Sequence, residues 1–374
     1  MSGHPGPGLK HSGAGCGRDP VFGPEIGPRP PPGRRLRGLA DTVGFAHLDY
    51  QMDEVMKRIK ARDGAAPERI FREKAVSAGD RWRMAIVPHD DYAYVGSLYP
   101  LVLANIKACT VIVFGVAHKA RQLGFEDQLI FDSFSHWHGP YGDIAVSPFR
   151  EEIMERLPQG SSRVSDEMHS IEHSVEAKLP FLQYYDRNVQ FVPILVPSMS
   201  YARMNELALP LAHTIAAILD ERRLQWGPDI ALLSSTDAVH YGDEGWSGRN
   251  FARYGADAQG YAKALLHEQR IMSDCFDCEL QPDRIERFTR YTLDDDDHRE
   301  YKWTWCGRYS VPFGLLVAWH LQQRLRAKPL TGTILGYATS IDHPQIQVDD
   351  LEGMGVTAPA TLRHWVGYAS VGFR

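Results

Sequence analysis

The sequence predicts an α/β protein with a mostly parallel central sheet and helices on both of its faces. Short apolar runs rich in β-branched residues, such as Met84–Pro88 and Thr110–Phe114, have the length and composition of buried strands. Between such runs lie longer segments whose apolar residues recur at helical spacing. Strands that alternate with helices are typical of a parallel sheet whose crossover connections cover both faces.

The predicted elements follow in chain order. A first amphipathic helix spans Tyr50–Arg62, and the globular part of the chain begins near Leu36. Beyond the two runs already given, the predicted strands are Val189–Val196, Asp229–Ser234, Thr331–Thr339 and Trp365–Phe373. The further predicted helices are Met204–Arg222, Ala256–Ser273 and Phe313–Arg326.

The first 34 residues differ in composition from the rest of the chain. They hold nine Gly and eight Pro and show almost no apolar periodicity. They therefore cannot bury enough apolar surface to offset the conformational entropy that is lost on folding. Residues 1–34 are therefore expected to be a disordered Pro/Gly-rich tail. No internal repeat or linker interrupts the remainder, and residues 35–374 are expected to form a single domain.

Composition excludes several classes of protein. A net charge of −6 and a pI near 6.2 argue against nucleic acid as a partner, because clustered Lys and Arg side chains are what bind phosphate backbones. No apolar run approaches the roughly 18 residues that span a membrane, and no signal peptide is recognisable, so a cytoplasmic location is expected. Five cysteines in a chain of 374 residues favour ligands or nucleophiles over disulfides.

Polar side chains capable of metal binding follow several predicted strands. His89 comes after the first strand, His118 after the second, and Asp237 and His240 after the fourth. Ligands of α/β sheets bind at the carboxyl ends of the strands, so these residues are expected at one edge. Each also has a structural interpretation: a turn for His89, a loop histidine for His118, and an N-cap for Asp237 with a neighbouring His240.

Two further candidates lie outside these strand ends. Cys306 precedes the helix at Phe313 with Gly and Arg beside it, a setting that favours thiolate, although a lone Cys is more often a small buried hydrophobe. His173 stands in Glu-His-Ser-Val-Glu, which reads as the start of an amphipathic helix. Cys275 and Cys278 form a CxxC without a second pair and are interpreted as structural. Two strand-end histidines, a cysteine and an Asp/His pair make a mononuclear metal site the leading hypothesis.

Six short motifs occur in an order that resembles the Memo family, also known as AmmeMemoRadiSam system protein B. The fold of that family is similar to that of class III extradiol ring-cleaving dioxygenases. The resemblance extends from about Ile86 to the C-terminus. The matching segments are Val87-Pro88-His89-Asp90-Asp91-Tyr92, Phe114-Gly115-Val116-Ala117-His118, Glu172-His173-Ser174-Val175-Glu176 with Leu179-Pro180-Phe181, Val192-Pro193-Ile194-Leu195-Val196, Ser235-Thr236-Asp237-Ala238-Val239-His240-Tyr241-Gly242 and Cys306-Gly307-Arg308.

The resemblance implies a metal centre in which His89, His118 and Cys306 approach one ion. It implies that Asp237, His240 and His173 line this site as catalytic residues. The related dioxygenases hold Fe(II) with two His and one carboxylate, so Fe(II) is the expected metal. A thiolate in place of the carboxylate is a softer ligand and leaves copper or zinc open.

The sequence departs from the family where Asp90 and Asp91 stand in place of Ala-Gly. Two carboxylates beside a metal ligand are expected to recruit a cationic group of a substrate or to supply an extra ligand. Trp303, Trp305 and Trp137 are interpreted either as aromatic walls of the pocket or as core residues.

Together these observations predict a non-haem metal-dependent oxygenase or dioxygenase, with Fe(II) as the expected metal, that oxidises a small molecule with O2. In this hypothesis His240, oriented by Asp237, moves a proton. Two alternatives stay open: a zinc- or copper-dependent hydrolase or redox protein, and a Memo-like metal-holding interaction or signalling protein.

Overall fold

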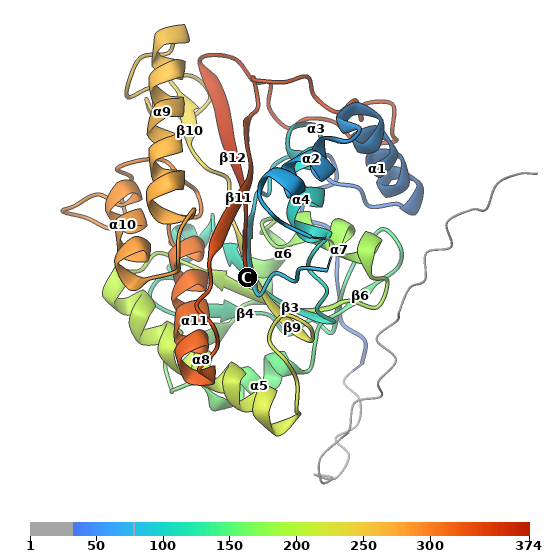
Figure 1. Cartoon of the computed structure of the whole chain (residues 1–374), viewed down its shortest axis with the longest axis vertical. Coiled ribbons are helices and arrows are strands. Elements are labelled where there is room, and N and C mark those ends of the chain that lie inside the picture. The colour runs from blue at the N-terminus through green and yellow to red at the C-terminus, as the bar shows by residue number, and fades with distance from the viewer. Residues whose placement is uncertain (1–32, 78) are drawn as a thin grey trace, which may run out of the picture.

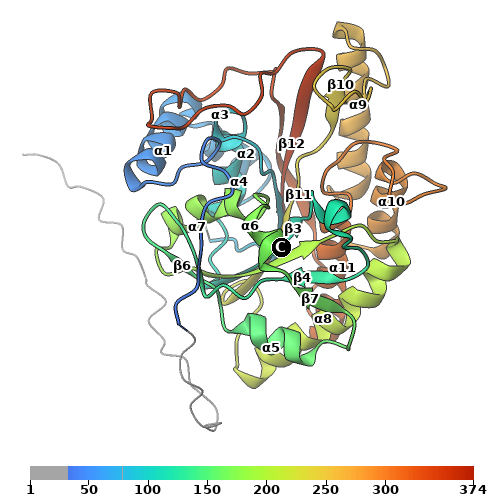
Figure 2. The ribbon, with the colours of Figure 1, turned by 180° about the vertical axis from the view of Figure 1, so that it is seen from behind.

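The fold is built on one large mixed sheet with helices on both faces (Figures 1 and 2). The computed structural model describes residues 33–77 and 79–374, and these contain a nine-stranded sheet with the order β10-β12-β2-β9-β3-β8-β4-β7 and β11 paired to β12. Almost all of the predicted tail, residues 1–34, lies outside the described residues, so its disorder stays a prediction.

The centre of the sheet is parallel, as predicted. It consists of β2 (Met84–Val87), β9 (Ile230–Ser235), β3 (Thr110–Val116) and β8 (Gln190–Val196), in which every residue except Gln190 is buried. Strands covered on both faces are continuously apolar, which is why they are visible as runs in the sequence.

The flanks of the sheet correct the prediction of a mostly parallel arrangement. On one side β12 runs antiparallel to β2, to β10 and to β11, and on the other side β4 runs antiparallel to β8. The strand β7 then pairs parallel to β4. The bounds of these flanking strands are His240–Gly242 (β10), Gly332–Thr339 (β11), His364–Phe373 (β12), Leu129–Phe131 (β4) and Ser162–Val164 (β7).

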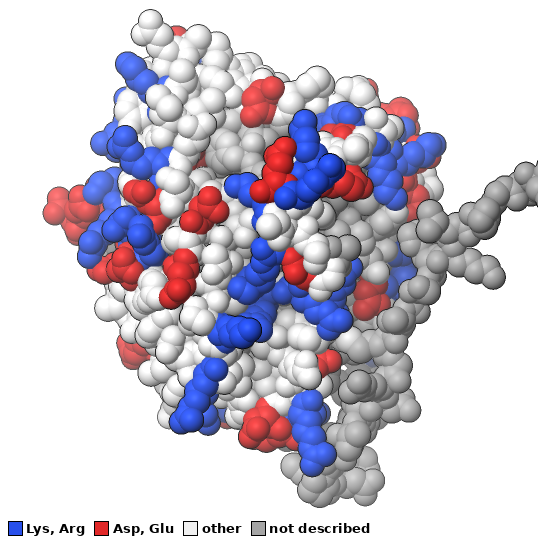
Figure 3. All heavy atoms as spheres, in the orientation of Figure 1, with Lys and Arg blue, Asp and Glu red and all other residues white. Residues whose placement is uncertain are grey.

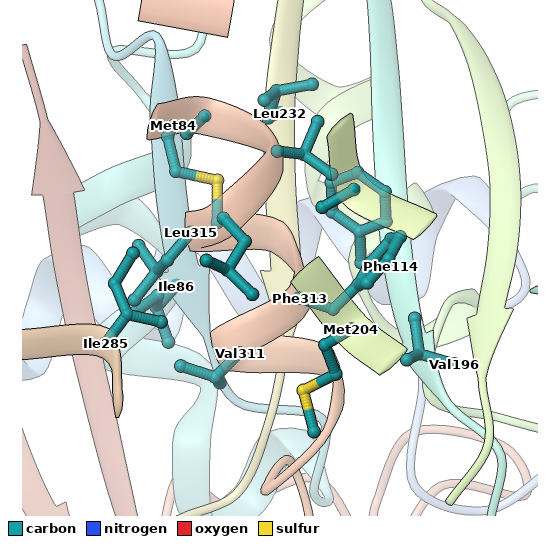
Figure 4. Packing of buried hydrophobic residues seen from close by; sticks show 14 of the residues in the cluster. Met84, Ile86, Phe114, Val196, Met204, Leu232, Ile285, Val311, Phe313 and Leu315 are labelled. Atoms are coloured by element: carbon teal, nitrogen blue, oxygen red, sulfur yellow. The ribbon is translucent and has the colours of Figure 1, made fainter. Parts of the chain in front are cut away.

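One face of the sheet packs against a group of long helices. Alternate strand residues such as Met84, Ile86 and Phe114 point into this core (Figure 4). There Phe114 meets Phe313 edge to face, with 5.4 Å between the ring centroids. The helices on this face are α5 (Phe149–Arg156), α8 (Tyr201–Glu221), α9 (Ala258–Cys275), α10 (Pro282–Thr292) and α11 (Ser310–Leu325).

The other face carries shorter helices. The intervening strand residues, among them Ala85, Val87 and Val113, point into a second core that Tyr92, Tyr99 and the N-terminal helix complete. The helices on this side of the sheet are α1 (Asp49–Asp63), α2 (Ala66–Glu73), α3 (Tyr92–Val95), α4 (Tyr99–Leu103), α6 (Asp166–Ser170) and α7 (Leu179–Tyr185). The helices on both faces confirm that part of the predicted fold class.

Smaller elements complete the fold. Single 3-10 turns are η1 (Gly96–Leu98), η2 (Ala120–Leu123) and η3 (Glu176–Lys178), and a three-stranded sheet combines β1 (Leu36–Arg37), β5 (His136–Trp137) and β6 (Ile144–Ala145). Elements this short show no periodicity of their own, so they cannot be predicted from the sequence.

The surface carries charges of both signs. On the face in Figure 3, Lys and Arg side chains run in a band down the middle, and Asp and Glu side chains lie beside and between them. Among the described residues, no helix combines the length and apolar character needed to cross a membrane.

Candidate metal centre

The carboxyl ends of three parallel strands bring the candidate residues to one edge of the sheet. His89 follows the end of β2 by two residues, His118 follows β3, and Asp237 follows β9. Cys306 arrives from the loop before α11, and an antiparallel bridge between Val239 and Trp305 fixes that loop beside the end of β9. The sheet edge therefore collects donors from segments that are far apart in sequence.

The ligand atoms of these residues converge. His89 Nε2 lies 3.4 Å from Cys306 Sγ, and the sulfur also accepts a hydrogen bond from the backbone N–H of Asp237 at 3.0 Å. A hydrogen bond links His118 to the same sulfur. Two sets of donor atoms, each lying within 4.8 Å of one another, share His89: one adds His118 and His173, the other adds Asp237 and Cys306. This cluster could hold a metal ion.

Glu172 orients His118. The carboxylate accepts from His118 Nδ1 at 2.9 Å and from the backbone N–H of His118 at 2.8 Å. Burial opposes the charge on His118, but the carboxylate outweighs it and raises the pKa of His118 well above its ordinary value. The pKa of Glu172 falls in spite of burial because of the same partner. With Nδ1 occupied by Glu172, the other ring nitrogen of His118 is the one available to a metal.

Ser235 orients His89 in a comparable way. Its hydroxyl lies 2.7 Å from His89 Nδ1 and donates to the carbonyl of Ser174 at 2.7 Å. Because the hydroxyl donates to a carbonyl, its oxygen accepts a hydrogen bond from Nδ1–H of His89. Nε2 is then the nitrogen with the lone pair, and it faces Cys306. Burial and, next, the charge of Lys178 hold the pKa of His89 well below its ordinary value.

Asp237 is engaged with His89. One carboxylate oxygen accepts from the backbone N–H of His89 at 2.8 Å, and the other lies 3.5 Å from His89 Nε2. Burial and the nearby charge of Asp90 raise the pKa of Asp237 to about 8. The expectation that Asp237 orients His240 therefore needs revision, because both of its oxygens face a different histidine.

His240 lies at the start of β10, on a side of the cluster lined by Trp246, with 5.2 Å between the ring centroids. Within the described part of the chain, its Nε2 is buried and has no hydrogen-bond partner. Burial, and then the charge of His118, lower the pKa of His240 to about 3, so the imidazole is neutral. A neutral imidazole with an unpaired nitrogen is suited to accept a proton or a hydrogen bond.

His173 stacks on His118, with 5.1 Å between ring centroids and 6° between ring planes. The sequence suggested a helix start here, but His173 lies in the loop between α6 and η3, and its side chain is 39% exposed. Burial and the charge of His118 lower the pKa of His173 to about 4. The side chains of His173 and His118 are 39% and 30% exposed, so these two histidines mark the open side of the site.

The two adjacent carboxylates beside His89 have partners within the fold. Asp91 accepts from the backbone N–H and the hydroxyl of Thr357, at 2.6 and 3.0 Å, and Asp90 accepts from Tyr368 at 2.6 Å. Burial first, and then Asp90, raise the pKa of Asp91 to about 7. Neither carboxylate belongs to the two converging donor sets of the described residues.

The remaining candidates are structural. Trp303, Trp305 and Trp137 are almost fully buried in the two cores, which corrects the alternative that they form pocket walls. Cys275 is buried at the end of α9, and neither it nor Cys278 belongs to a converging donor set of the described residues.

Sequence reasoning missed three residues that support the site: Ser235 as the partner of His89, Lys178, and Glu268. Lys178 could have been noticed as a cation inside the apolar run Ala177–Leu182, which signals a buried charge. Glu268 sits in the long amphipathic helix α9 and carries no local signal at all.

Glu268 holds the loop that carries Cys306. One of its oxygens accepts from the indole N–H groups of Trp303 and Trp305, at 2.6 and 2.8 Å, and the other accepts from Tyr337 at 3.0 Å. Burial raises the pKa of Glu268, and these donors oppose that shift. The buried carboxylate thus ties the segment just before Cys306 to α9 and β11.

Replacing Glu268 by glutamine is expected to destabilise the protein by about 1–3 kcal/mol, because the amide turns a donor toward Tyr337 or the indoles and leaves buried groups unpaired. Urea unfolding followed by tryptophan fluorescence measures the change. Glu206→Gln is the matched control, since that side chain is exposed on α8, and it should stay within about 0.5 kcal/mol of the parent. Equal stability of the two variants would contradict the role given to Glu268.

Comparisons with known proteins agree with this geometry. A family model described as Memo-like protein matches residues 48–349. A MEMO1 family protein of Pyrococcus horikoshii is 25% identical over 264 residues, which cover 69% of this chain and 80% of that protein.

Two other relatives align over shorter stretches. MEMO1 family proteins of Pyrobaculum arsenaticum and Saccharolobus solfataricus are 28% and 31% identical, over 44% and 42% of this chain. In these two alignments the chain spans about half of the relative, 55% and 52% of its length.

Proposed function

Because this chain belongs to the family of Memo-like proteins, we propose that it is a metal-dependent oxygenase whose centre is held by His89, His118 and Cys306. The proposed metal is Fe(II), and the proposed reaction is oxidation of a small molecule by O2. The observation that carries the proposal is the convergence of two imidazoles on one buried sulfur.

The chemistry of the donor set fits a transition metal. Imidazole suits iron, copper and zinc, and a thiolate shifts the preference toward softer metals. Each histidine has its Nδ1 occupied by an outer partner, Glu172 for His118 and Ser235 for His89. Such partners are typical of metal-ligating histidines, because they fix the tautomer and the orientation of the ring.

When bound, Fe(II) would supply the redox chemistry with O2, which the side chains of the site do not supply themselves. His240 accepts a proton from the substrate, since its Nε2 is unpaired and its imidazole is neutral. Asp237 holds the backbone of His89 and so fixes the position of a ligand. His173 contacts the substrate from the open side.

The organic substrate is proposed to be a small molecule with a cationic group. Support comes from Asp90 and Asp91, two neighbouring carboxylates that take part in none of the ion pairs of the described residues. Burial is the main cause that raises the pKa of both, and the charge of Asp41 adds to it. A cation beside these carboxylates would favour their charged forms.

The test combines elemental analysis with oxygen uptake. Protein purified without oxygen is expected to contain iron, and oxygen consumption is expected with aromatic or amino-acid-derived compounds. Each amine in the screen is paired with its neutral N-acetyl analogue, and faster uptake with the amine is expected. Zinc without oxygen uptake would favour the hydrolase, and iron without oxygen uptake would favour the metal-holding interaction protein. Protein purified without any metal would contradict the proposed function.

A further inference from the structure

Lys178 is a fully buried lysine directly behind the proposed metal centre. Its side chain has no exposed surface, although it is among the largest side chains of the core. Its ammonium group donates to the carbonyl of Ser174 at 2.5 Å and to the hydroxyl of Ser235. No carboxylate within ion-pair distance of Lys178 is found among the described residues, so its burial is not explained by a salt bridge.

A buried cation without an ion-pair partner is costly, and its retention calls for a role. Burial lowers the pKa of Lys178 to about 7, and the charges of Asp237, Cys306 and Glu172 oppose that shift. All three belong to the metal centre or orient one of its ligands. The lysine is therefore placed next to the residues of the proposed centre.

Ser174, the first acceptor of Lys178, connects to the His118 side of the centre. Its backbone N–H donates to Glu172 at 2.9 Å, and its hydroxyl donates to the carbonyl of Val116 at 2.9 Å. Val116 is the last residue of β3, two positions before His118. The carbonyl of Ser174 is thus part of the loop that orients His118.

Ser235, the second acceptor, connects to the His89 side. It is the last residue of β9, and its hydroxyl pairs with His89 Nδ1. The Ser235 hydroxyl also donates directly to the Ser174 carbonyl, at 2.7 Å. One ammonium group therefore contacts both partners of the link between the loop that orients His118 and the strand end that orients His89.

We propose that Lys178 is a positioning residue of the metal centre, which fixes His89 and His118 relative to each other by tying Ser174 to Ser235. The inference rests on the proposed metal centre, which it deepens. It predicts that removing the Lys178 ammonium group disturbs both ligands, although Lys178 contacts neither of them directly.

The first test uses metal-free protein and reads the imidazoles directly. Nitrogen-15 NMR of labelled histidines reports which ring nitrogen carries the proton and how uniform each ring's environment is. Lys178→Met, which keeps the length of the side chain and removes the donor, is expected to shift the signals of both His89 and His118. Ser235→Ala removes the direct partner of His89 Nδ1 and is expected to shift the signals of His89 most strongly. Parent-like signals for both rings in Lys178→Met would overturn the proposal.

The second test measures Zn²⁺ affinity by competition with a chelator. Lys178→Met is expected to bind Zn²⁺ about 10–100-fold more weakly than the parent, the range for loss of an outer-shell partner. Lys178→Gln keeps an N–H donor and is expected to recover part of the affinity, which a role in charge alone would not give. It also serves as the second variant if Lys178→Met does not fold.

The matched control is Gln322→Met. Gln322 is equally a buried polar side chain, and it accepts from the backbone N–H of Leu330 at 2.6 Å. It lies twelve residues along α11 from Ser310, roughly 18 Å from the end of the helix near the site. This variant should lower the melting temperature and leave the Zn²⁺ affinity unchanged. Equal Zn²⁺ affinity of Lys178→Met and the parent would leave Lys178 with a role in folding only. A parent protein that binds no Zn²⁺ would instead refute the proposed function.

Discussion

Replacing Cys306 by alanine is expected to remove most of the bound metal. The sulfur is the point at which His89 and His118 meet, and it lies 3.4 Å from His89 Nε2. Loss of a ligand should weaken metal binding by more than the 10–100-fold typical of an outer-shell partner. Elemental analysis and Zn²⁺ titration of the same preparations measure the loss. His89→Ala and His118→Ala are expected to show comparable losses.

The control for this prediction is Cys275→Ala. Cys275 is also buried and free, but it lies at the end of α9 and in no converging donor set of the described residues. The Cys275→Ala variant should have a lower free energy of unfolding, because a buried side chain is truncated, and an unchanged metal content. Cys306→Ser separates coordination from packing, because the hydroxyl can still accept from the backbone N–H of Asp237. A full metal complement in Cys306→Ala would take Cys306 out of the site.

Replacing His240 by alanine is expected to lower turnover about 10²–10⁴-fold with most of the metal retained, since a general base contributes that much to the rate. The neutral ring and the unpaired Nε2 support proton transfer, and His240 belongs to neither converging donor set of the described residues. Metal content, melting temperature and rate are to be measured on one preparation. Full activity per folded molecule would leave His240 with a structural role.

Asp237→Asn provides the contrast. If Asp237 oriented His240, this variant would reproduce part of the loss of turnover. In the structure its oxygens face the backbone N–H and the ring of His89 instead. Asp237→Asn is therefore expected to weaken metal binding, as Cys306→Ala does. It is not expected to lose turnover while keeping its metal, as His240→Ala does.

The sequence by itself determined the alternating strands and helices and the positions of the ligands along them. Buried parallel strands such as Thr110–Val116 are continuously apolar, and the polar residue that follows each one is visible without any knowledge of packing. The motifs around His89, His118 and Cys306 were specific enough to indicate the family before the structure was considered.

Tertiary structure alone decided which side chains pair. Asp237 was assigned to His240, three residues away, but it binds His89, 148 residues away, because β2 and β9 are neighbours in the sheet. Glu172 reaches His118 across 54 residues for the same kind of reason. Local patterns report the burial and period of one segment, whereas the partner of a buried polar group depends on which strand ends and loops the fold brings together. That is also why the antiparallel flanks of the sheet and the hydrogen-bond partners of Lys178 are visible only in the folded chain.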